Sequence, residues 1–331
     1  MASLTDQFGR SHDYLRVSVT DRCDLRCVYC MPPDGLDLSS KREILSYEEL
    51  HEVVSTGVEL GIEKVRLTGG EPFVRKNLLD FIEMLSTLDD LKKLAVTTNG
   101  LQLEDKLDRL NSTRLNHINV SLDSLDSDRY ERVTRGGNLD KVVRSIDRAV
   151  ELDFTVKVNV VALKGLKAEE IDSFVDFARK RDIEVRFIEF MPLCGGAWKT
   201  EDFRSLSRLK ETLIERYNLS PVEETGVSQV YDLPGNKGRI GFIASLTNSF
   251  CESCSRLRLS STGELYPCLF SRDNVSLRDT LRSGSGRDGL TRKFEQALEL
   301  KWEGNPAYTD DWNPERESPP ESFALIRELG G

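Results

Sequence analysis

Residues 23–30 read CDLRCVYC and place three of the chain's seven cysteines, Cys23, Cys27 and Cys30, within one short stretch. In a cytosolic protein of this size, clustered cysteines bind metal more often than they form disulfides. Iron–sulfur clusters are held by cysteine thiolates, ordinarily four for a four-iron cubane. Three thiolates would ligate three irons and leave the fourth with an open coordination position. An open position distinguishes a catalytic metal centre from a structural one.

A second group of three cysteines, Cys251, Cys254 and Cys268, lies far along the chain. It offers the same number of thiolates, so it could also leave one iron open. The seventh cysteine, Cys194, stands alone, and an isolated cysteine is usually a small buried apolar residue to which we assign no role. The whole chain has three histidines, which does not favour a histidine-based zinc site.

The composition of the chain excludes several classes of protein. Its formal net charge of −10 argues against non-specific nucleic-acid binding. No run approaches the roughly 18 apolar residues of a membrane span, and the first residues lack the apolar stretch of a signal peptide. A hydrophobic content of 38% supports a sizeable core in a chain of 331 residues. We therefore expect a cytoplasmic protein that binds neither nucleic acid nor a membrane.

Strand-like and helical segments alternate along the first part of the chain. Segments that read as strands lie at residues 15–20, 64–70, 93–100, 117–124, 155–162 and 184–192. Between most of them lie helical patterns, such as one that opens with a capping box at Ser46 and Glu49 and stops at Gly61. Alternating strands and helices predict a parallel sheet. About six such units predict an α/β fold built as a partial (β/α)6 TIM-like barrel.

Most of the predicted strands are polar on one face. Arg16 and Ser18, Arg66, Thr97 and Lys157 each alternate with apolar neighbours. One interpretation is a sheet with one face in water. Because helices should cover the outside of the barrel, we favour the alternative that the polar residues face its interior. A closed barrel fills its interior with branched apolar side chains, so the pattern predicts an open barrel with a polar ligand in its lumen. The cations suit a phosphorylated substrate.

After residue 200 the alternation fades. Residues 238–245 and two segments joined near Thr262 and Gly263 read as an antiparallel β element that carries the second cysteine group. We expect a barrel domain over residues 1–225. A C-terminal region over residues 226–331 would then close the barrel, carry the second cluster and end in a di-glycine tail.

The first cysteine motif, followed by TGGEP at residues 68–72, resembles the radical S-adenosylmethionine (SAM) superfamily. In that superfamily the open iron of a 4Fe-4S cluster binds the amino and carboxylate groups of SAM. One electron then cleaves the sulfonium to methionine and a 5′-deoxyadenosyl radical. The family fold is a partial or complete (β/α) barrel. The resemblance thus implies that Cys23, Cys27 and Cys30 hold such a cluster.

Nearly the whole chain, including FCESCSRLR at residues 250–258 and the terminal GG, resembles the GTP 3′,8-cyclase family of molybdenum cofactor biosynthesis. The resemblance implies a second 4Fe-4S cluster on Cys251, Cys254 and Cys268, whose open iron faces the guanine base. It further implies a lyase that removes H3′ from GTP, joins C3′ to C8 and yields 3′,8-cyclo-7,8-dihydro-GTP. This is the first step of molybdopterin formation.

The same resemblance implies roles for individual residues. The SAM contacts would be Tyr29, Gly70, Ser121 and Met191. The GTP contacts would be Arg16, Arg66, Thr97, Lys157, Arg256, Leu257 and Arg258. The catalytic residues would be Arg256, Arg258, Gly330 and Gly331, the last two in a tail that enters the active site. Ser255 stands where the family usually has asparagine, which leaves the guanine-side contacts open.

The resemblance also implies partners: flavodoxin or ferredoxin as electron donor, cyclic pyranopterin monophosphate synthase as the next enzyme, and a homodimer as a possible assembly. Two alternatives stay open. A radical SAM peptide-modifying enzyme also carries an auxiliary cluster, although usually with more cysteines than this chain has. A two-cluster electron carrier or a zinc-stabilised binding module would fill every metal coordination position and need little lumen.

Overall fold

The structure is a computed structural model that describes residues 4–32, 35, 37–191, 199–223 and 226–304. Cys194, Gly330 and Gly331 lie outside the described residues. Within them the strands form one sheet of twelve, in the order β12-β11-β10-β1-β2-β3-β4-β5-β6-β9-β8-β7. The parallel strands that open the fold are β1 (Tyr14–Ser18), β2 (Lys64–Thr68), β3 (Lys93–Thr98), β4 (Leu115–Ser121), β5 (Thr155–Val161) and β6 (Glu184–Ile188).

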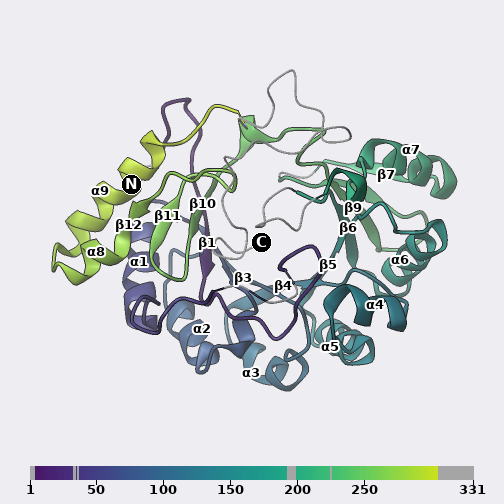
Figure 1. The fold of residues 1–331 in the computed structure, drawn as a ribbon, viewed down its shortest axis with the longest axis horizontal. Coiled ribbons are helices and arrows are strands. Elements are labelled where there is room, and N and C mark those ends of the chain that lie inside the picture. Colours follow the sequence, from purple (N-terminus) through teal and green to yellow (C-terminus); the bar gives the residue numbers. More distant parts are fainter. Residues whose placement is uncertain (1–3, 33–34, 36, 192–198, 224–225, 305–331) are drawn as a thin grey trace.

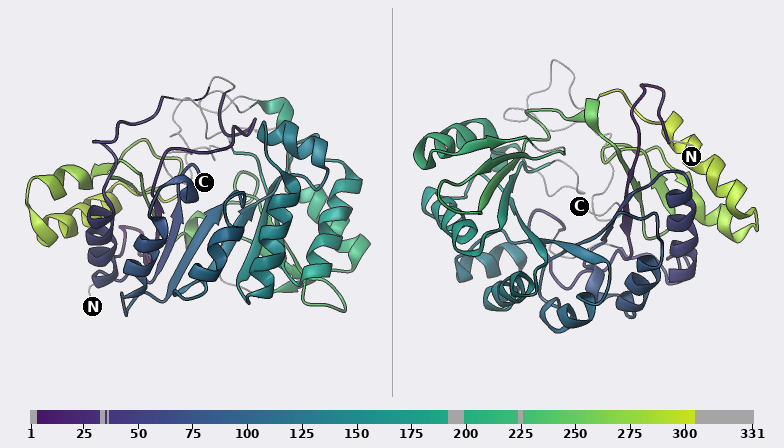
Figure 2. Two further views of the ribbon diagram at one scale, coloured as in Figure 1. Left: turned by 90° about the horizontal axis from the view of Figure 1, so that it is seen from below. Right: turned by 180° about the vertical axis from the view of Figure 1, so that it is seen from behind.

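These strands curve around a lumen, and helices cover the outer face of the sheet (Figure 1). The covering helices are α1 (Tyr47–Glu59), α2 (Leu78–Ser86), α3 (Leu107–Leu110), α4 (Ser127–Thr134), α5 (Leu139–Glu151) and α6 (Ala168–Arg181). The views from below and behind show the same arrangement (Figure 2). The sheet does not close on itself, since β12 and β7 remain as its two edges. The predicted partial (β/α)6 barrel is therefore confirmed.

Helix α1 shows why the sequence signals for its start were reliable. The Ser46 hydroxyl accepts a hydrogen bond from the Glu49 backbone N–H, and the Glu49 carboxylate accepts one from the Ser46 N–H. This capping box satisfies N–H groups that the first helical turn leaves without partners. Leu50, Val53 and Val54 lie on the buried face of the helix, against the sheet.

The two faces of the strands divide as their alternation predicted. Leu15, Val17, Leu67, Val120 and Val158 are almost fully buried and belong to the main hydrophobic core between sheet and helices. Their polar neighbours along each strand must point the other way, because successive side chains in a strand face opposite sides. The lumen is therefore polar.

The C-terminal strands differ from the single antiparallel element that the sequence predicted. β9 (Arg239–Ile243) lies parallel to β6, whereas β10 (Arg256–Leu259) lies parallel to β1 at the opposite side of the barrel. The predicted turn at Gly263 does join β10 to the antiparallel β11 (Glu264–Tyr266), and Gly263 has a φ of +89°. The two segments separate because each pairs with an unpaired edge of the parallel sheet.

Shorter elements complete the fold on both sides. They are β7 (Ser220–Val222), β8 (Gln229–Asp232), β12 (Val275–Ser276), α7 (Leu206–Tyr217), α8 (Leu277–Arg282) and α9 (Gly286–Glu299). No helix in the described ranges is both long enough and apolar enough to cross a lipid bilayer. One sheet runs through both halves of the chain, and a domain division at residue 225 stays a prediction.

Candidate active site

The loop after β1 carries the first three cysteines, and the TGGEP turn after β2 packs directly against it. The Gly70 N–H donates to the Thr20 carbonyl at 2.8 Å, and the Glu71 N–H donates to the Arg22 carbonyl at 2.8 Å. A Cβ on Gly70 would lie 2.3 Å from the Arg22 carbonyl oxygen, so only glycine allows this approach. Gly70, a predicted SAM contact, therefore lies beside the residues that lead into Cys23.

Glu71 of the same turn is a buried carboxylate that the sequence analysis did not single out. It accepts hydrogen bonds from the Thr98 hydroxyl at 2.8 Å and the Asn99 N–H at 2.6 Å. Burial raises the pKa of Glu71 to about 7, against the opposing effect of these hydrogen bonds. The Asn99 amide in turn donates to Asp24 at 2.7 Å, next to Cys23. The ends of β2 and β3 are thereby joined to the cysteine loop.

Tyr29 lies deeper in the site, and Asp123 holds it. The Tyr29 hydroxyl donates to one Asp123 carboxylate oxygen at 2.6 Å, and the Val161 N–H donates to the other at 2.9 Å. Burial raises the pKa of Asp123 to about 6, although both hydrogen bonds lower it. Asp123 follows Ser121, the last residue of β4 and another predicted SAM contact. Asp123 was not among the residues predicted for the site, although it has the same parity as Ser121.

A small apolar cluster contacts residues from the loops of both cysteine groups. Its fully buried members are Phe190, Phe203, Leu246 and Phe270. Tyr29 and Met191, both predicted SAM contacts, pack against it, and so does Cys268 of the second cysteine group. Residues predicted to serve the two clusters thus share one apolar wall.

None of the three cysteines of the first group forms a disulfide among the described residues, and each is half-buried. Burial raises the pKa of Cys23 to about 12, and burial with the nearby Asp123 and the neighbouring thiols raises the pKa of Cys27 well above its ordinary value. Cys23 and Cys27 are therefore protonated without a metal, and iron would have to displace their protons. In the described part of the chain, no group of three or more His, Cys, Asp or Glu side chains is arranged to hold a single metal ion. The motif predicts a four-iron cluster instead, and three neighbouring cysteines are suitable ligands for such a cluster.

Positively charged side chains surround the second cysteine group. Cys251 begins a short turn, η4 (Cys251–Ser253), and Arg10 donates to the Cys251 carbonyl at 2.8 Å. Burial would raise the pKa of Cys254, but the charges of Arg256 and Lys301 bring it to about 6. The Cys254 thiol therefore loses its proton to bind iron more easily near neutral pH than Cys23 and Cys27 do.

Lys301 is a buried cation beside this group, with an exposed fraction of 3%. Its ammonium donates to the Arg256 carbonyl at 2.7 Å and to the Pro267 carbonyl at 2.7 Å. The Arg256 carbonyl lies at the start of β10, just after Cys254, and the Pro267 carbonyl directly precedes Cys268. Lys301 thus ties the two parts of the second cysteine group together and adds a positive charge beside them. The sequence analysis missed it, because nothing in the local pattern marks a lysine between α9 and the end of the described chain.

Arginines gather on the lumen face of β10, β1 and β2. Arg16 lies in register with Arg66 on one side and with Arg258 on the other, and the Arg66 guanidinium donates to the Tyr14 hydroxyl at 2.7 Å. Burial lowers the pKa of Arg16 to about 10 and that of Arg258 well below its ordinary value, and neighbouring cations add to both effects. Such crowding of buried positive charge favours a bound anion.

Arg256 completes the group of predicted substrate contacts on β10, and Leu257 does not join it. Arg256 is in register with Tyr14, one level below Arg16, so it faces the same lumen. The Leu257 side chain lies in the main core and has no exposed surface. If Leu257 contacts a ligand in the lumen, it must do so through its backbone, because its side chain points to the other face of the sheet.

Lys157 approaches the lumen from β5 and is paired with an acid that the sequence analysis missed. Its ammonium lies 2.6 Å from a Glu184 carboxylate oxygen, and Arg186 pairs with the same carboxylate. Glu184 and Arg186 occupy the lumen face of β6, where the alternation used for the other strands would have placed them. Thr97 of β3 faces the same space, and its hydroxyl is buried without a hydrogen-bond partner among the described residues. The lumen wall therefore offers polar groups to a ligand.

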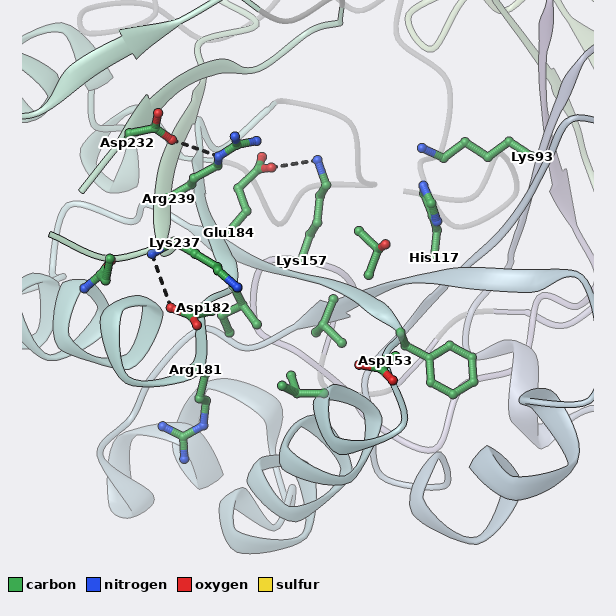
Figure 3. A pocket seen from close by; sticks show the side chains of 16 residues that line it. Lys93, His117, Asp153, Lys157, Arg181, Asp182, Glu184, Asp232, Lys237 and Arg239 are labelled. Atoms are coloured by element: carbon green, nitrogen blue, oxygen red, sulfur yellow. Dashed lines mark hydrogen bonds and ion pairs between the residues drawn. The ribbon is translucent and has the colours of Figure 1, made fainter. Parts of the chain in front are cut away.

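A cavity of about 910 Å³ opens at the amino ends of the parallel strands. Figure 3 shows Lys93, His117, Lys157, Glu184 and Arg239 among its lining side chains, with the Lys93 ammonium directed across the cavity toward Lys157. Lys157 is thus common to this cavity and to the predicted substrate contacts.

Comparisons with known proteins identify relatives of both halves of the chain. The family model of the radical SAM superfamily matches residues 17–178, and that of molybdenum cofactor synthesis C matches residues 183–306. The chain is 42% identical to GTP 3′,8-cyclase of Thermodesulfovibrio yellowstonii, over 94% of this chain and 98% of the relative. It is 43% identical to molybdenum cofactor biosynthesis protein 1 of Dictyostelium discoideum, over 89% of this chain but only 48% of that longer protein.

Among solved structures, SuiB of Streptococcus suis, bound to its precursor peptide SuiA, is similar to the chain with a TM-score of 0.63. The sequences are 17% identical, and the match covers 93% of this chain and 75% of SuiB. This likeness shows a shared fold.

Proposed function

Because the chain belongs to the GTP 3′,8-cyclase family of radical SAM enzymes, we propose that it converts GTP to 3′,8-cyclo-7,8-dihydro-GTP. This reaction is the first step of molybdenum cofactor biosynthesis. The observation that carries the proposal is the placement of two cysteine trios around one cationic lumen. Tyr29, which precedes Cys30, and Cys268 of the second trio pack against the same apolar cluster.

The cofactors of this enzyme class are two 4Fe-4S clusters and SAM. Cys23, Cys27 and Cys30 would hold the cluster that binds SAM, and the second trio would hold the other. When bound at the first cluster, SAM would supply the radical chemistry that removes H3′ from GTP. The protein supplies binding, orientation and exclusion of water.

The residues of the chain divide these tasks by position. Gly70, Ser121, Tyr29 and Met191 lie at the carboxyl ends of the strands, where they would bind SAM beside the first cysteine loop. The Tyr29–Asp123 hydrogen bond fixes the ring of Tyr29, which packs on the apolar cluster and keeps water from it.

The cations lie lower in the lumen and would bind the phosphates of GTP. They are Arg16, Arg66, Lys157, Arg256 and Arg258, with Thr97 as a neutral donor. A hydrogen bond to a charged group contributes roughly 1.5–3 kcal/mol, so several together can hold a triphosphate against water. This holds the sugar in one orientation, because the phosphates and the base are bound at different levels of the lumen.

Product analysis after anaerobic reconstitution tests the proposal. With GTP, SAM and a chemical reductant, we expect cyclised nucleotide to form together with 5′-deoxyadenosine. Formation of 5′-deoxyadenosine without any cyclised nucleotide would contradict the substrate assignment. The predictions of flavodoxin or ferredoxin as reductant, hand-off to cyclic pyranopterin monophosphate synthase, a homodimer and a cytoplasmic location need separate tests. The role of the Gly330-Gly331 tail also stays a prediction.

A peptide-modifying radical SAM enzyme is the weaker alternative. SuiB shares the fold, but at 17% identity the likeness reaches no further than the fold. The row of arginines at one level of β10, β1 and β2 suits phosphates better than a peptide backbone. Tight binding of a peptide with weak binding of GTP would reverse this preference.

A further inference from the structure

Lys93 is a cation of the lumen that is not among the predicted SAM or GTP contacts. It begins β3 and has the same parity along the strand as Thr97, so its side chain leaves the same face of the sheet. Figure 3 shows its ammonium directed over His117 toward Lys157. Among the described residues, the Lys93 ammonium has no hydrogen-bond or ion-pair partner, whereas Lys64 at the same level of β2 is held 2.7 Å from Asp13.

The register places Lys93 at the outer end of the cationic wall. Arg66 of β2 lies opposite Ala95 of β3, and Ala95 lies opposite His117 of β4. Lys93 precedes Ala95 by two residues, which is about 7 Å along a strand. It therefore extends the row of Arg16 and Arg66 toward the amino ends of the strands.

Charge alone makes this position unfavourable in the free protein. The cavity that Lys93 lines also carries the cations Lys157 and Arg239, which pair with Glu184 and Asp232 respectively. Burial lowers the pKa of Lys93, and the charges of Lys157, Arg66 and Arg186 lower it further. Glu184 already pairs with Lys157 and Arg186, so it cannot compensate Lys93 as well. An anion that entered from the lumen would relieve this repulsion.

We propose that Lys93, with His117 beside it, binds the terminal phosphate of the nucleotide and makes the site prefer a triphosphate over a monophosphate. The inference rests on the proposed function, because it assumes that GTP binds in the lumen with its sugar toward the predicted SAM contacts at the carboxyl ends of the strands. The inner phosphates contact the arginines of β1, β2 and β10, and the terminal phosphate reaches the level of Lys93. A nucleoside monophosphate is too short to reach it.

Equilibrium dialysis of GTP, GDP and GMP against the anaerobically reconstituted protein tests the proposal. We expect Lys93→Ala to weaken GTP binding roughly tenfold or more, the loss of one charge-assisted hydrogen bond, and to leave GMP binding unchanged. Lys93→Arg should keep most of the preference. The matched control is Lys92→Ala, since Lys92 is exposed and pairs with Glu63 on the outside of the sheet. Equal losses for GTP and GMP, or no loss for either, would overturn the assignment.

Inorganic tripolyphosphate distinguishes failure of this inference from failure of the proposed function. Competition by tripolyphosphate that depends on Lys93 supports the phosphate site even if the protein does not cyclise GTP. If the protein cyclises GTP but Lys93→Ala changes neither the affinity for GTP nor that for tripolyphosphate, the phosphate site is wrong and the proposed reaction is still supported.

Discussion

At the scale of single residues, the site depends on close approaches that leave no room for a side chain. Gly69 and Gly70 both press against the backbone of residues 20–22, and a Cβ on Gly69 would lie 2.5 Å from the Thr20 carbonyl oxygen. The turn thereby fixes where the cysteine loop begins. The glycines of TGGEP are thus explained by sterics as well as by ligand binding.

Gly70→Ala should therefore push the TGGEP turn away from the backbone of the cysteine loop. Because backbone atoms of Arg22 cannot move aside as a flexible side chain would, the cysteine loop must shift. We expect SAM cleavage to fall on the order of a hundredfold, the cost of a small misplacement at a reacting centre. The measurement is 5′-deoxyadenosine formed per reconstituted cluster. Gly165→Ala is the control, since the nearest atom to its Cβ would be the Arg129 side chain at 3.9 Å; an equal loss in both variants would contradict this explanation.

The site residues that the sequence could not identify are mostly buried acids. The six clustered cysteines and Gly70 were identifiable because their spacing carries the chemistry. Glu71, Asp123 and Glu184 were not, because an acid is recognised as a positioning group only when its partners are known. Those partners come from other strands: Asn99 for Glu71, Tyr29 for Asp123, and Lys157 for Glu184.

At the scale of elements, period-two alternation predicted both the parallel strands and their lumen face. It did not predict where β9 and β10 would pair, because alternation describes the faces of a strand and not its neighbours. The six predicted strands all appear, and each ends before the predicted residue, since the last residues turn into the loops that carry the site. Tyr14 and Lys93 share the parity of Arg16 and Thr97, so the same rule applied to whole strands would have found them.

One element contact is expected to control the second cysteine group. Glu189, just after β6, is a buried carboxylate that accepts the Leu246 N–H at 2.8 Å and the Thr247 N–H at 3.1 Å. It ties β6 to the loop that leads from β9 into Cys251. The carboxylate also accepts from the Leu206 N–H at the start of α7. Three segments of the fold thus converge on one side chain.

Glu189→Gln should weaken this junction, because one amide NH₂ would face backbone N–H donors. We expect the free energy of unfolding to fall by about 1–3 kcal/mol, and iron content to fall toward that of a single cluster. Urea unfolding and iron analysis of the same preparations measure the two effects. Glu211→Gln on the exposed face of α7 is the matched control. Retention of both clusters with unchanged stability would show that the loop is held by other contacts.

At the scale of the whole molecule, a chain with net charge −10 encloses a strongly cationic lumen. The excess acid lies elsewhere, and most of the ion pairs on the helices are exposed, where each contributes little to stability. The electrostatic cost of the free protein is therefore concentrated in the lumen. Acidification should lower the stability of the free protein, because protons bound by groups in the lumen add positive charge to a region that is already positive.

His117 gives this cost a definite pH range. Burial, together with the charges of Lys93, Arg66 and Lys157, lowers the pKa of His117 from 6.5 to about 4. Between these two values the unfolded chain binds a proton that the folded chain does not, so the free energy of unfolding falls as the pH falls from 6.5 to 4. Below pH 4 both states bind the proton and this contribution levels off.

His117→Gln should therefore flatten the dependence of the urea midpoint on pH between 6.5 and 4. His51→Gln on the outer helix α1 is the control and should leave the slope of the parent chain in place. Tripolyphosphate should flatten the slope of the unmodified chain as well, because a bound polyanion raises the pKa of His117 in the folded state. Parallel pH profiles for the parent chain and His117→Gln would show that acid destabilisation arises outside the lumen. Flattening by tripolyphosphate in the parent chain but not in Lys93→Ala would place the anion beside His117.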